Sequence, residues 1–162
     1  SEVLAIQNGS NARVYGAEVS LYSAISRQFS AWALANFTRG IETDDQGLES
    51  YMRHAPPFFG RFQMRYLNGK FSALAGVDVN GAIPYERLAL SERSKAFMYA
   101  LDPEGNPFSP SWHSLNLRFN YELRKWQAFM AVENITNQRY RPYSSGIAGP
   151  GRQLVLGVQT RR

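Results

Sequence analysis

The stretch Ala131–Val158, AVENITNQRYRPYSSGIAGPGRQLVLGV, contains two runs of alternating apolar residues separated by a polar loop rich in glycine and proline. The first run closes at Glu133-Asn134, and the loop extends from Thr136 to Gly151. The alternating residues of the second run are Leu154, Leu156 and Val158. Alternation with a period of two indicates a β-strand, because successive side chains point to opposite faces of a sheet. The stretch therefore predicts a strand, a long loop and a second strand.

The composition bounds the class of protein. The chain has 162 residues, no cysteine, 44% hydrophobic and 14% aromatic residues, and a mean hydropathy of −0.38. This hydropathy is typical of soluble proteins, but it also suits a membrane barrel, because only half of each strand's residues face lipid. No run approaches the ~20 apolar residues of a membrane helix, and the lack of cysteine excludes disulfides and cysteine metal sites. The net charge of +5 is spread over single basic residues, so no nucleic-acid partner is predicted.

The same alternation recurs along the whole chain. Strands are expected near residues 12–25, 28–41, 59–67, 70–79 and 112–121, besides 126–132 and 152–161. The connections between them alternate in length. Short ones fall at Ser26-Arg27, Asn68-Gly69 and 122–125, and long ones at 42–58, 80–111 and 134–151. Asn68-Gly69 is a strong signal for a tight hairpin, because both residue types tolerate a positive φ.

The sorting of loop lengths favours one architecture. An irregular loop as long as residues 80–111 argues against a compact soluble domain. Outer-membrane barrels place tight turns at one end and long loops at the other, and their strands have the length found here. We therefore predict an all-β fold, an antiparallel up-and-down meander of about seven or eight strands that forms a segment of a large transmembrane β-barrel.

The two faces of the expected sheet differ in chemistry. Aromatic residues on the apolar face flank the short turns, as an interfacial girdle would: Phe29, Tyr66, Phe71, Tyr121 and Trp126. Charged residues fall on the polar face, which would line the lumen: Glu18, Arg61, Arg65, Asp78, Arg118 and Glu133. Arg39 shares the apolar face but stands at an outer strand end, where its charge can reach water. The barrel assignment requires that Phe62, Met64, Leu115, Leu117 and Leu156 be exposed on the outer wall rather than packed in a core.

Catalytic, cofactor and metal-binding residues are not predicted. His113-Ser114 has the composition of a base and nucleophile, but neighbouring strand residues point to opposite faces. His54 stands alone in a loop, and Glu42 with Asp44-Asp45 lacks the ligand spacing of a Ca²⁺ loop. Gly149-Pro150-Gly151 precedes no helix, so it is not a phosphate loop. Three arginines flank the last loop and are either an anion-binding rim or a solvated one: Arg139, Arg141 and Arg152.

Several of these segments together resemble a known family. They are Val132–Asn137, Tyr140-Arg141, Gly146-Ile147 and Gly149–Arg152, with Asn11–Val19, Pro56-Pro57 ahead of Gly60-Arg61-Phe62, and Ser114–Arg118. In this order they resemble the C-terminal part of the β-barrel of the TonB-dependent outer-membrane receptors. The resemblance covers nearly the whole chain. Residues 1–162 would then be the C-terminal portion of such a barrel, without the plug domain and the N-terminal strands.

The resemblance implies a location, partners and a function. Receptors of this family form barrels of about 22 strands around an N-terminal plug. They reside in the outer membrane of Gram-negative bacteria and take up scarce nutrients such as ferric siderophores, haem or cobalamin. The expected partners are outer-membrane lipid and lipopolysaccharide, the rest of the barrel and plug (in the same protein or in a separate chain), and the TonB complex acting through the plug. No cofactor is expected. The chain departs from the family at its end, where Arg161-Arg162 replaces the usual terminal Phe.

Three other functions are weighed against this one. A barrel subunit without a plug would have a structural or complex-forming role in the same membrane. A soluble β-sandwich binding module would be released from membranes by salt or carbonate without detergent. An enzyme is least favoured, because no serine and histidine share a face.

Overall fold

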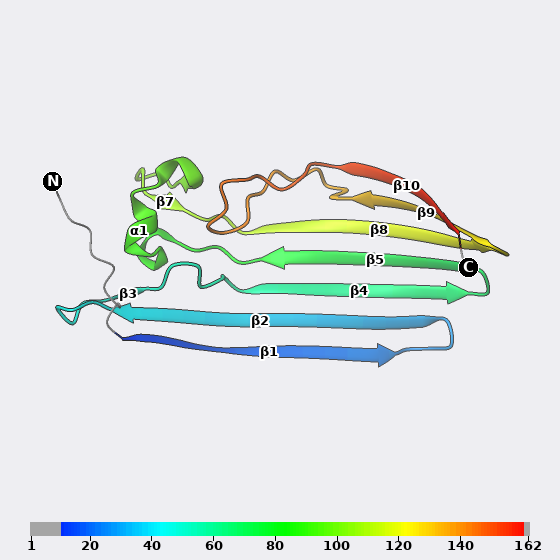
Figure 1. Cartoon of the computed structure of the whole chain (residues 1–162), viewed down its shortest axis with the longest axis horizontal. Coiled ribbons are helices and arrows are strands. Elements are labelled where there is room, and N and C mark those ends of the chain that lie inside the picture. The colour runs from blue at the N-terminus through cyan, green and yellow to red at the C-terminus, as the bar shows by residue number, and fades with distance from the viewer. Residues whose placement is uncertain (1–10, 161–162) are drawn as a thin grey trace.

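The computed structural model describes residues 11–160, which form one large antiparallel sheet with an elaborate region at one end (Figure 1). The strands of this sheet are β1 (Ala12–Ala24), β2 (Phe29–Thr43), β3 (Glu49–Tyr51), β4 (Phe59–Asn68), β5 (Phe71–Asn80), β8 (Trp112–Leu123), β9 (Trp126–Glu133) and β10 (Gln153–Thr160). Their spatial order, β1-β2-β4-β5-β8-β9-β10, follows the chain, and β3 pairs with the outer end of β2. The predicted all-β meander of seven or eight strands is confirmed.

Short and long connections lie at opposite ends of the sheet (Figure 1). We call these the turn end and the loop end. No helix within residues 11–160 is both long and apolar enough to cross a membrane. The prediction of an irregular segment at 80–111 is wrong in detail. It contains η1 (Tyr85–Arg87), α1 (Leu90–Arg93), η2 (Ala96–Met98) and the hairpin of β6 (Ala100–Leu101) with β7 (Pro107–Phe108). Elements of two to four residues are too short to leave a periodic signal.

The tight turn between β4 and β5 is shifted by one residue from the prediction. Asn68 pairs with Phe71 as the last rung of the ladder, so the two turn residues are Gly69 and Lys70. Gly69 has a φ of 56°, and Lys70 does not have a positive φ. A positive φ at the first turn residue alone is the pattern of a type II′ hairpin, which requires glycine there. Asn68 is therefore a strand residue, although Asn-Gly correctly marked the hairpin.

The strand register aligns residues of equal parity across the sheet. Arg61 on β4 lies opposite Leu34 on β2 and Asp78 on β5, and Asp78 lies opposite Ser114 on β8. Each ladder therefore continues the same alternation, and the sheet has one polar and one apolar face. Hollows of about 390, 700 and 150 Å³ lie over the polar face. The polar face is the concave one, as the inside of a barrel must be.

The sheet has no hydrophobic core of its own. The buried hydrophobic residues within the described part of the chain are Ile83, Leu88, Ala89 and Ala131, and all but Ala131 belong to the loop end. On the apolar face, Phe62 is 44% and Leu156 67% exposed, and Met64 and Leu115 are exposed as well. Leu117 is half-buried, because it lies between Ala75 on β5 and Val132 on β9. A β-sandwich would bury one face against a second sheet, so that alternative is not supported.

Aromatic side chains form a continuous row on the apolar face at the turn end. The rings of Phe29 and Tyr66 are 4.8 Å apart, those of Tyr66 and Phe71 6.2 Å, and those of Phe71 and Phe119 6.3 Å. Tyr121 and Trp126 extend the same row and are exposed. The ring contacts cross β2, β4, β5 and β8, so aromatic residues beside the short turns do form a row. Its position at a membrane interface stays a prediction.

Both outer strands of the sheet are edges. In the described residues, β1 pairs with β2 alone and β10 with β9 alone. An edge strand exposes a row of backbone donors and acceptors, which is costly in lipid unless another strand pairs with it. The family resemblance implies that residues 152–161 pair with the first strand of the barrel, and this pairing stays a prediction. Arg161-Arg162 lies outside the described residues.

Candidate functional site

A network of polar side chains crosses the polar face near the loop end. Arg61 forms an ion pair with Asp78. The Asn116 amide donates to Asp78 Oδ2 at 3.2 Å, and Asn116 Oδ1 accepts from Ser114 Oγ at 3.3 Å. The backbone N–H of Asn134 also donates to Asn116 Oδ1, at 3.0 Å. The network joins β4, β5 and β8 to the start of the last loop and fixes the side chains that line the concave face.

A groove of about 700 Å³ lies above this network at the loop end. Its floor is polar, with Arg61, Asp78 and Asn116, and its upper wall is aromatic. The rings of Trp112 and Tyr140 stack there at 4.3 Å with an interplanar angle of 27°. A concave site with aromatic walls and a few fixed polar groups is the usual construction of a small-molecule site.

The aromatic wall depends on a glycine. A Cβ atom on Gly149 would lie 2.3 Å from Cζ of Tyr140. No real side chain tolerates such a contact, so only glycine allows the Tyr140 ring to lie against the backbone at this point. The Gly149-Pro150-Gly151 motif, which is not a phosphate loop, therefore has a packing role at the groove.

The last loop is closed by two asparagines of the motif that opened the sequence. Asn134 is buried, has a φ of 49°, and donates through Nδ2 to the carbonyls of Gln138 and Pro150, both at 2.9 Å. Asn137 Oδ1 accepts the N–H of Arg152 at 2.9 Å. Asparagine is one of the few residues that adopts a left-handed conformation at low cost. The two side chains thus hold the end of β9 against the start of β10.

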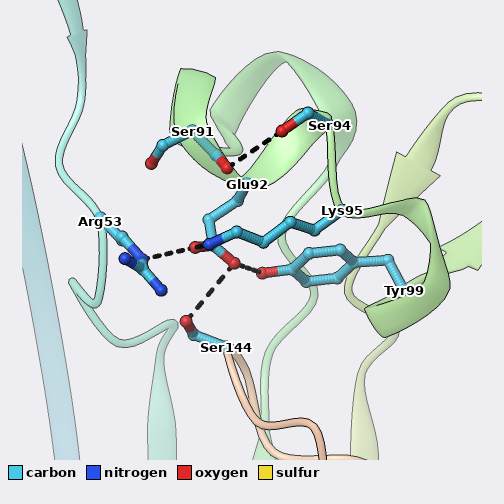
Figure 2. A network of polar contacts seen from close by, with 7 residues as sticks. All are labelled: Arg53, Ser91, Glu92, Ser94, Lys95, Tyr99 and Ser144. Carbon is cyan, nitrogen blue, oxygen red and sulfur yellow. Dashed lines mark hydrogen bonds and ion pairs between the residues drawn. The ribbon is translucent and has the colours of Figure 1, made fainter. Parts of the chain in front are cut away.

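A second network joins the three long loops at one buried carboxylate (Figure 2). Glu92 in α1 is fully buried. Its Oε1 lies 2.5 Å from Nε of Arg53 in the first loop and 2.9 Å from Nζ of Lys95. Its Oε2 accepts from the Tyr99 hydroxyl at 2.6 Å and from Ser144 Oγ in the last loop at 3.5 Å. We call Glu92 and these four partners the loop clamp, since they come from all three long loops.

The charges of the loop clamp are stable over a wide pH range. Burial by itself raises the pKa of Glu92, but the hydrogen bonds from Tyr99 and Lys95 and the charges of Lys95 and Arg53 outweigh it and lower that pKa to about 2. Burial and the bond to Glu92 raise the pKa of the Tyr99 hydroxyl well above its ordinary value. Glu92 therefore stays charged and Tyr99 stays a donor at any physiological pH.

The residues considered from sequence for catalysis or metal binding do not come together. Ser114 is buried on the polar face beside Asn116, whereas His113 is exposed on the opposite face. Asp44 closes its own turn by accepting the N–H groups of Gln46 and Leu48, and His54 is exposed in a left-handed conformation. No group of three or more metal-ligating side chains occurs within residues 11–160.

Of the three rim arginines, Arg141 has a side-chain hydrogen bond to another loop. Arg141 donates from Nη1 to the carbonyl of Phe97 at 3.1 Å, so it ties the last loop to the second long loop. Arg139 and Arg152 are exposed. Sequence reasoning missed the loop clamp, because no local pattern connects Arg53, Glu92 and Ser144. A weak signal was present in Glu92 and Lys95, which are spaced for a pair on one helical turn.

Together these features define a class of protein: a segment of a barrel wall, with a polar concave face, an apolar outer face and joined loops at one end. A family profile described as "TonB dependent receptor-like, beta-barrel" matches residues 3–135. The chain belongs to the TonB-dependent receptor family. Members and solved neighbours of this family are receptors and transporters rather than enzymes. No curated protein matches the sequence significantly.

Solved structures share this fold at low sequence identity. The "Copper transporter OprC" has 18% identity and a TM-score of 0.72, and the match covers 91% of this chain and 22% of that one. The siderophore receptor PiuA from Acinetobacter baumannii has 17% identity and a TM-score of 0.62, with coverages of 91% and 21%. The FpvAI–pyocin S2 complex has 16% identity and a TM-score of 0.61, with coverages of 91% and 19%. The chain thus spans about a fifth of the length of each of these proteins.

Proposed function

We propose that residues 1–162 form the C-terminal portion of the barrel of a receptor in the outer membrane of a Gram-negative bacterium. Its function there is energy-coupled uptake of a scarce nutrient, of the class of ferric siderophores, haem or cobalamin. The observation that carries the proposal is the groove of about 700 Å³ on the concave polar face, whose lining includes Asn134, Tyr140 and Pro150 of the last loop. A nutrient that had passed the loops from outside would reach this groove.

The remaining partners follow from the open form of the sheet. The edges of β1 and β10 would be paired by further barrel strands, and a plug would occupy the polar face. The TonB complex would act through that plug, as is usual in the family. Lipid and lipopolysaccharide would cover the apolar face, whose exposed side chains match the apolar band of outer-membrane barrels.

An uptake experiment on the complete protein tests the proposal. Cells that express it are given radiolabelled ferric siderophores, haem, cobalamin or copper. We expect uptake of one of these ligands, and we expect that uptake to stop when the energy-transducing complex is deleted. Release of the protein by carbonate without detergent would refute the membrane location. A protein that stays in the outer membrane, imports none of these ligands and supports another complex would instead favour a structural barrel subunit.

Variants of the groove separate ligand binding from barrel assembly. Tyr140→Ala removes one ring of the aromatic wall, and we expect weaker ligand binding with an unchanged amount of folded barrel. Tyr22→Ala, an exposed aromatic on the polar face at the turn end, is the matched control and is expected to bind as the wild type does.

A further inference from the structure

The groove of about 700 Å³ contains an acid that the described part of the chain does not neutralise. Two of the charged residues that line it, Arg61 and Asp78, form an ion pair with each other. The third is Glu133, which is exposed and takes part in no ion pair within residues 11–160. The exposed Arg139 and Arg152 of the last loop do not belong to this lining. On this wall the groove therefore has a net negative charge, and Glu133 is its source.

The basic side chain on the neighbouring strand is turned away from Glu133. The guanidinium of Arg118 lies 4.3 Å from the centre of the Phe129 ring, and its Nε donates to Asn120 Oδ1 at 3.0 Å. Both partners lie toward the turn end of the sheet. Arg118 and Glu133 line the smaller hollow of about 150 Å³ together, but no ion pair joins them. The charge of Glu133 is therefore free to act on a ligand.

The groove also offers a flat aromatic surface. The stack with Tyr140 is the ring contact that the structure shows for Trp112, whose side chain is half-exposed. Part of the indole is therefore available to a ligand in the groove. The face of an aromatic ring carries partial negative charge, so it attracts C–H and N–H groups rather than anions.

The spacing of Trp112 and Glu133 sets the size of a ligand that touches both. Glu133 follows Val132, the partner of Leu117, so it lies beside Asn116 at the end of the ladder. Trp112 and Asn116 are four residues apart on β8, which corresponds to ~13 Å along the strand. A ligand that contacts both residues therefore spans on the order of 10 Å. This is the size of a metal chelate rather than of a single sugar or amino acid.

The charge of a ferric chelate depends on its donor groups. Three hydroxamates balance the charge of Fe³⁺ and give an uncharged complex, whereas three catecholates leave the complex trianionic. The carboxylate of Glu133 repels a trianion. An uncharged chelate is not repelled, and its amide or ammonium N–H groups can donate to the carboxylate.

We infer that Glu133 sets the charge preference of the groove. The groove takes an uncharged or positively charged ferric chelate of the hydroxamate class and rejects anionic tris-catecholates. Such a ligand stacks on Trp112 and donates hydrogen bonds to Glu133. The inference rests on the proposed uptake function and deepens it by naming the class of ligand.

The test is equilibrium binding of radioiron-labelled chelates to the complete protein in detergent. The probes are an uncharged trihydroxamate, a trihydroxamate with an ammonium group, and a tris-catecholate. The wild type is expected to bind the first two more tightly than the third. Glu133→Gln should raise the affinity for the tris-catecholate about fivefold, the effect in physiological salt of one charge ~6 Å from three ligand charges. Glu133→Arg should raise it about 25-fold, and neither variant should change the affinity for the uncharged chelate.

Two control variants accompany these measurements. Glu122→Gln makes the same charge change on the polar face of β8 at the turn end, and all three affinities should stay unchanged. Trp112→Leu removes the flat surface and should weaken binding of all three chelates by about tenfold. High salt should reduce the difference between the chelates in the wild type. Heat-dependent migration on gels reports whether each variant still folds.

Two results would overturn the inference. One is a wild-type affinity for the tris-catecholate that equals or exceeds that for the uncharged trihydroxamate. The other is an equal change of all three affinities in Glu133→Gln, which would mean that Glu133 supports the shape of the groove or pairs with a basic residue of the plug. Preferred uptake of the tris-catecholate would refute the inference and uphold the proposed function, whereas a lack of energy-dependent uptake of any ligand would refute the proposed function itself.

Discussion

Replacing Glu92 by glutamine removes the one negative charge of the loop clamp and leaves its shape. Glutamine still accepts from the Tyr99 hydroxyl, but both ion pairs are lost. Lys95, whose side chain is 28% exposed, then keeps a poorly solvated charge, whereas that of Arg53, 45% exposed, is better screened by water. Most of the cost is therefore expected from the Lys95 side.

The size of the effect follows from the pKa of Glu92. Its lowering from 4.5 to about 2 means that the folded loops favour the charged form by about 3 kcal/mol. Measured costs of breaking a buried ion pair have the same order, about 3–5 kcal/mol. We expect Glu92→Gln to favour opening of the loops by about 3 kcal/mol, which raises the open population about 100-fold.

Hydrogen–deuterium exchange of the complete protein measures this opening. Amides in residues 42–58, 81–111 and 134–151 should exchange about 100-fold faster in the variant, while those of β4, β5 and β8 should not change. Glu104→Gln, an exposed acid of the same loop, is the matched control. Unchanged exchange in the three loops would refute the clamp, and faster exchange in the strands as well would show that Glu92 supports the whole sheet rather than the loops.

Four further outcomes are expected. Because the folded pKa of Glu92 lies below its ordinary value, its contribution is complete above pH 4.5 and lost as the pH falls toward 2, so the protection of the loop amides, relative to the intrinsic exchange rate at each pH, should be constant from pH 5 to 8 and fall only in strong acid. Asn134→Asp removes the two amide donors to Gln138 and Pro150 and should loosen the last loop by about 1–3 kcal/mol, seen as protease cleavage there, whereas a loop that stays uncut would contradict the role of Asn134 in closing it. A Cβ on Gly157 would lie 2.3 Å from the Phe129 ring, so Gly157→Ala should lower the yield of folded barrel and Phe129→Leu should restore it; an unaffected single variant would show that the ring moves freely. Leu156→Arg on the apolar face should destabilise the barrel in vesicles by about 2–4 kcal/mol in urea titrations, and equal destabilisation by Val155→Arg on the polar face would contradict the assignment of the faces.

Sequence alone determined the seven long strands, their two faces and the sorting of loop lengths, but not the short strands β3, β6 and β7. These features are local, because side-chain direction in a strand alternates with every residue and needs no knowledge of the partner strand. The exposure of Phe62 and Leu156 on an uncovered face could be predicted for that reason. The hairpin at Asn68-Gly69 was found but displaced by one residue, since only the register decides which residues still belong to the ladder.

Tertiary structure decided what the loops do. Arg53 and Ser144 contact the carboxylate of Glu92, although the three residues come from three different loops. Arg39 on β2 and Arg87 in η1 both lie against the ring of Tyr51 on β3. Contacts of this kind depend on how long segments close in space, and no spacing in the chain encodes them. In the stretch Ala131–Val158, the alternation of apolar residues predicts strand, loop and strand from the sequence alone. The contact of Asn134 with Pro150 and that of Tyr140 with Trp112 are decided only by the folded chain.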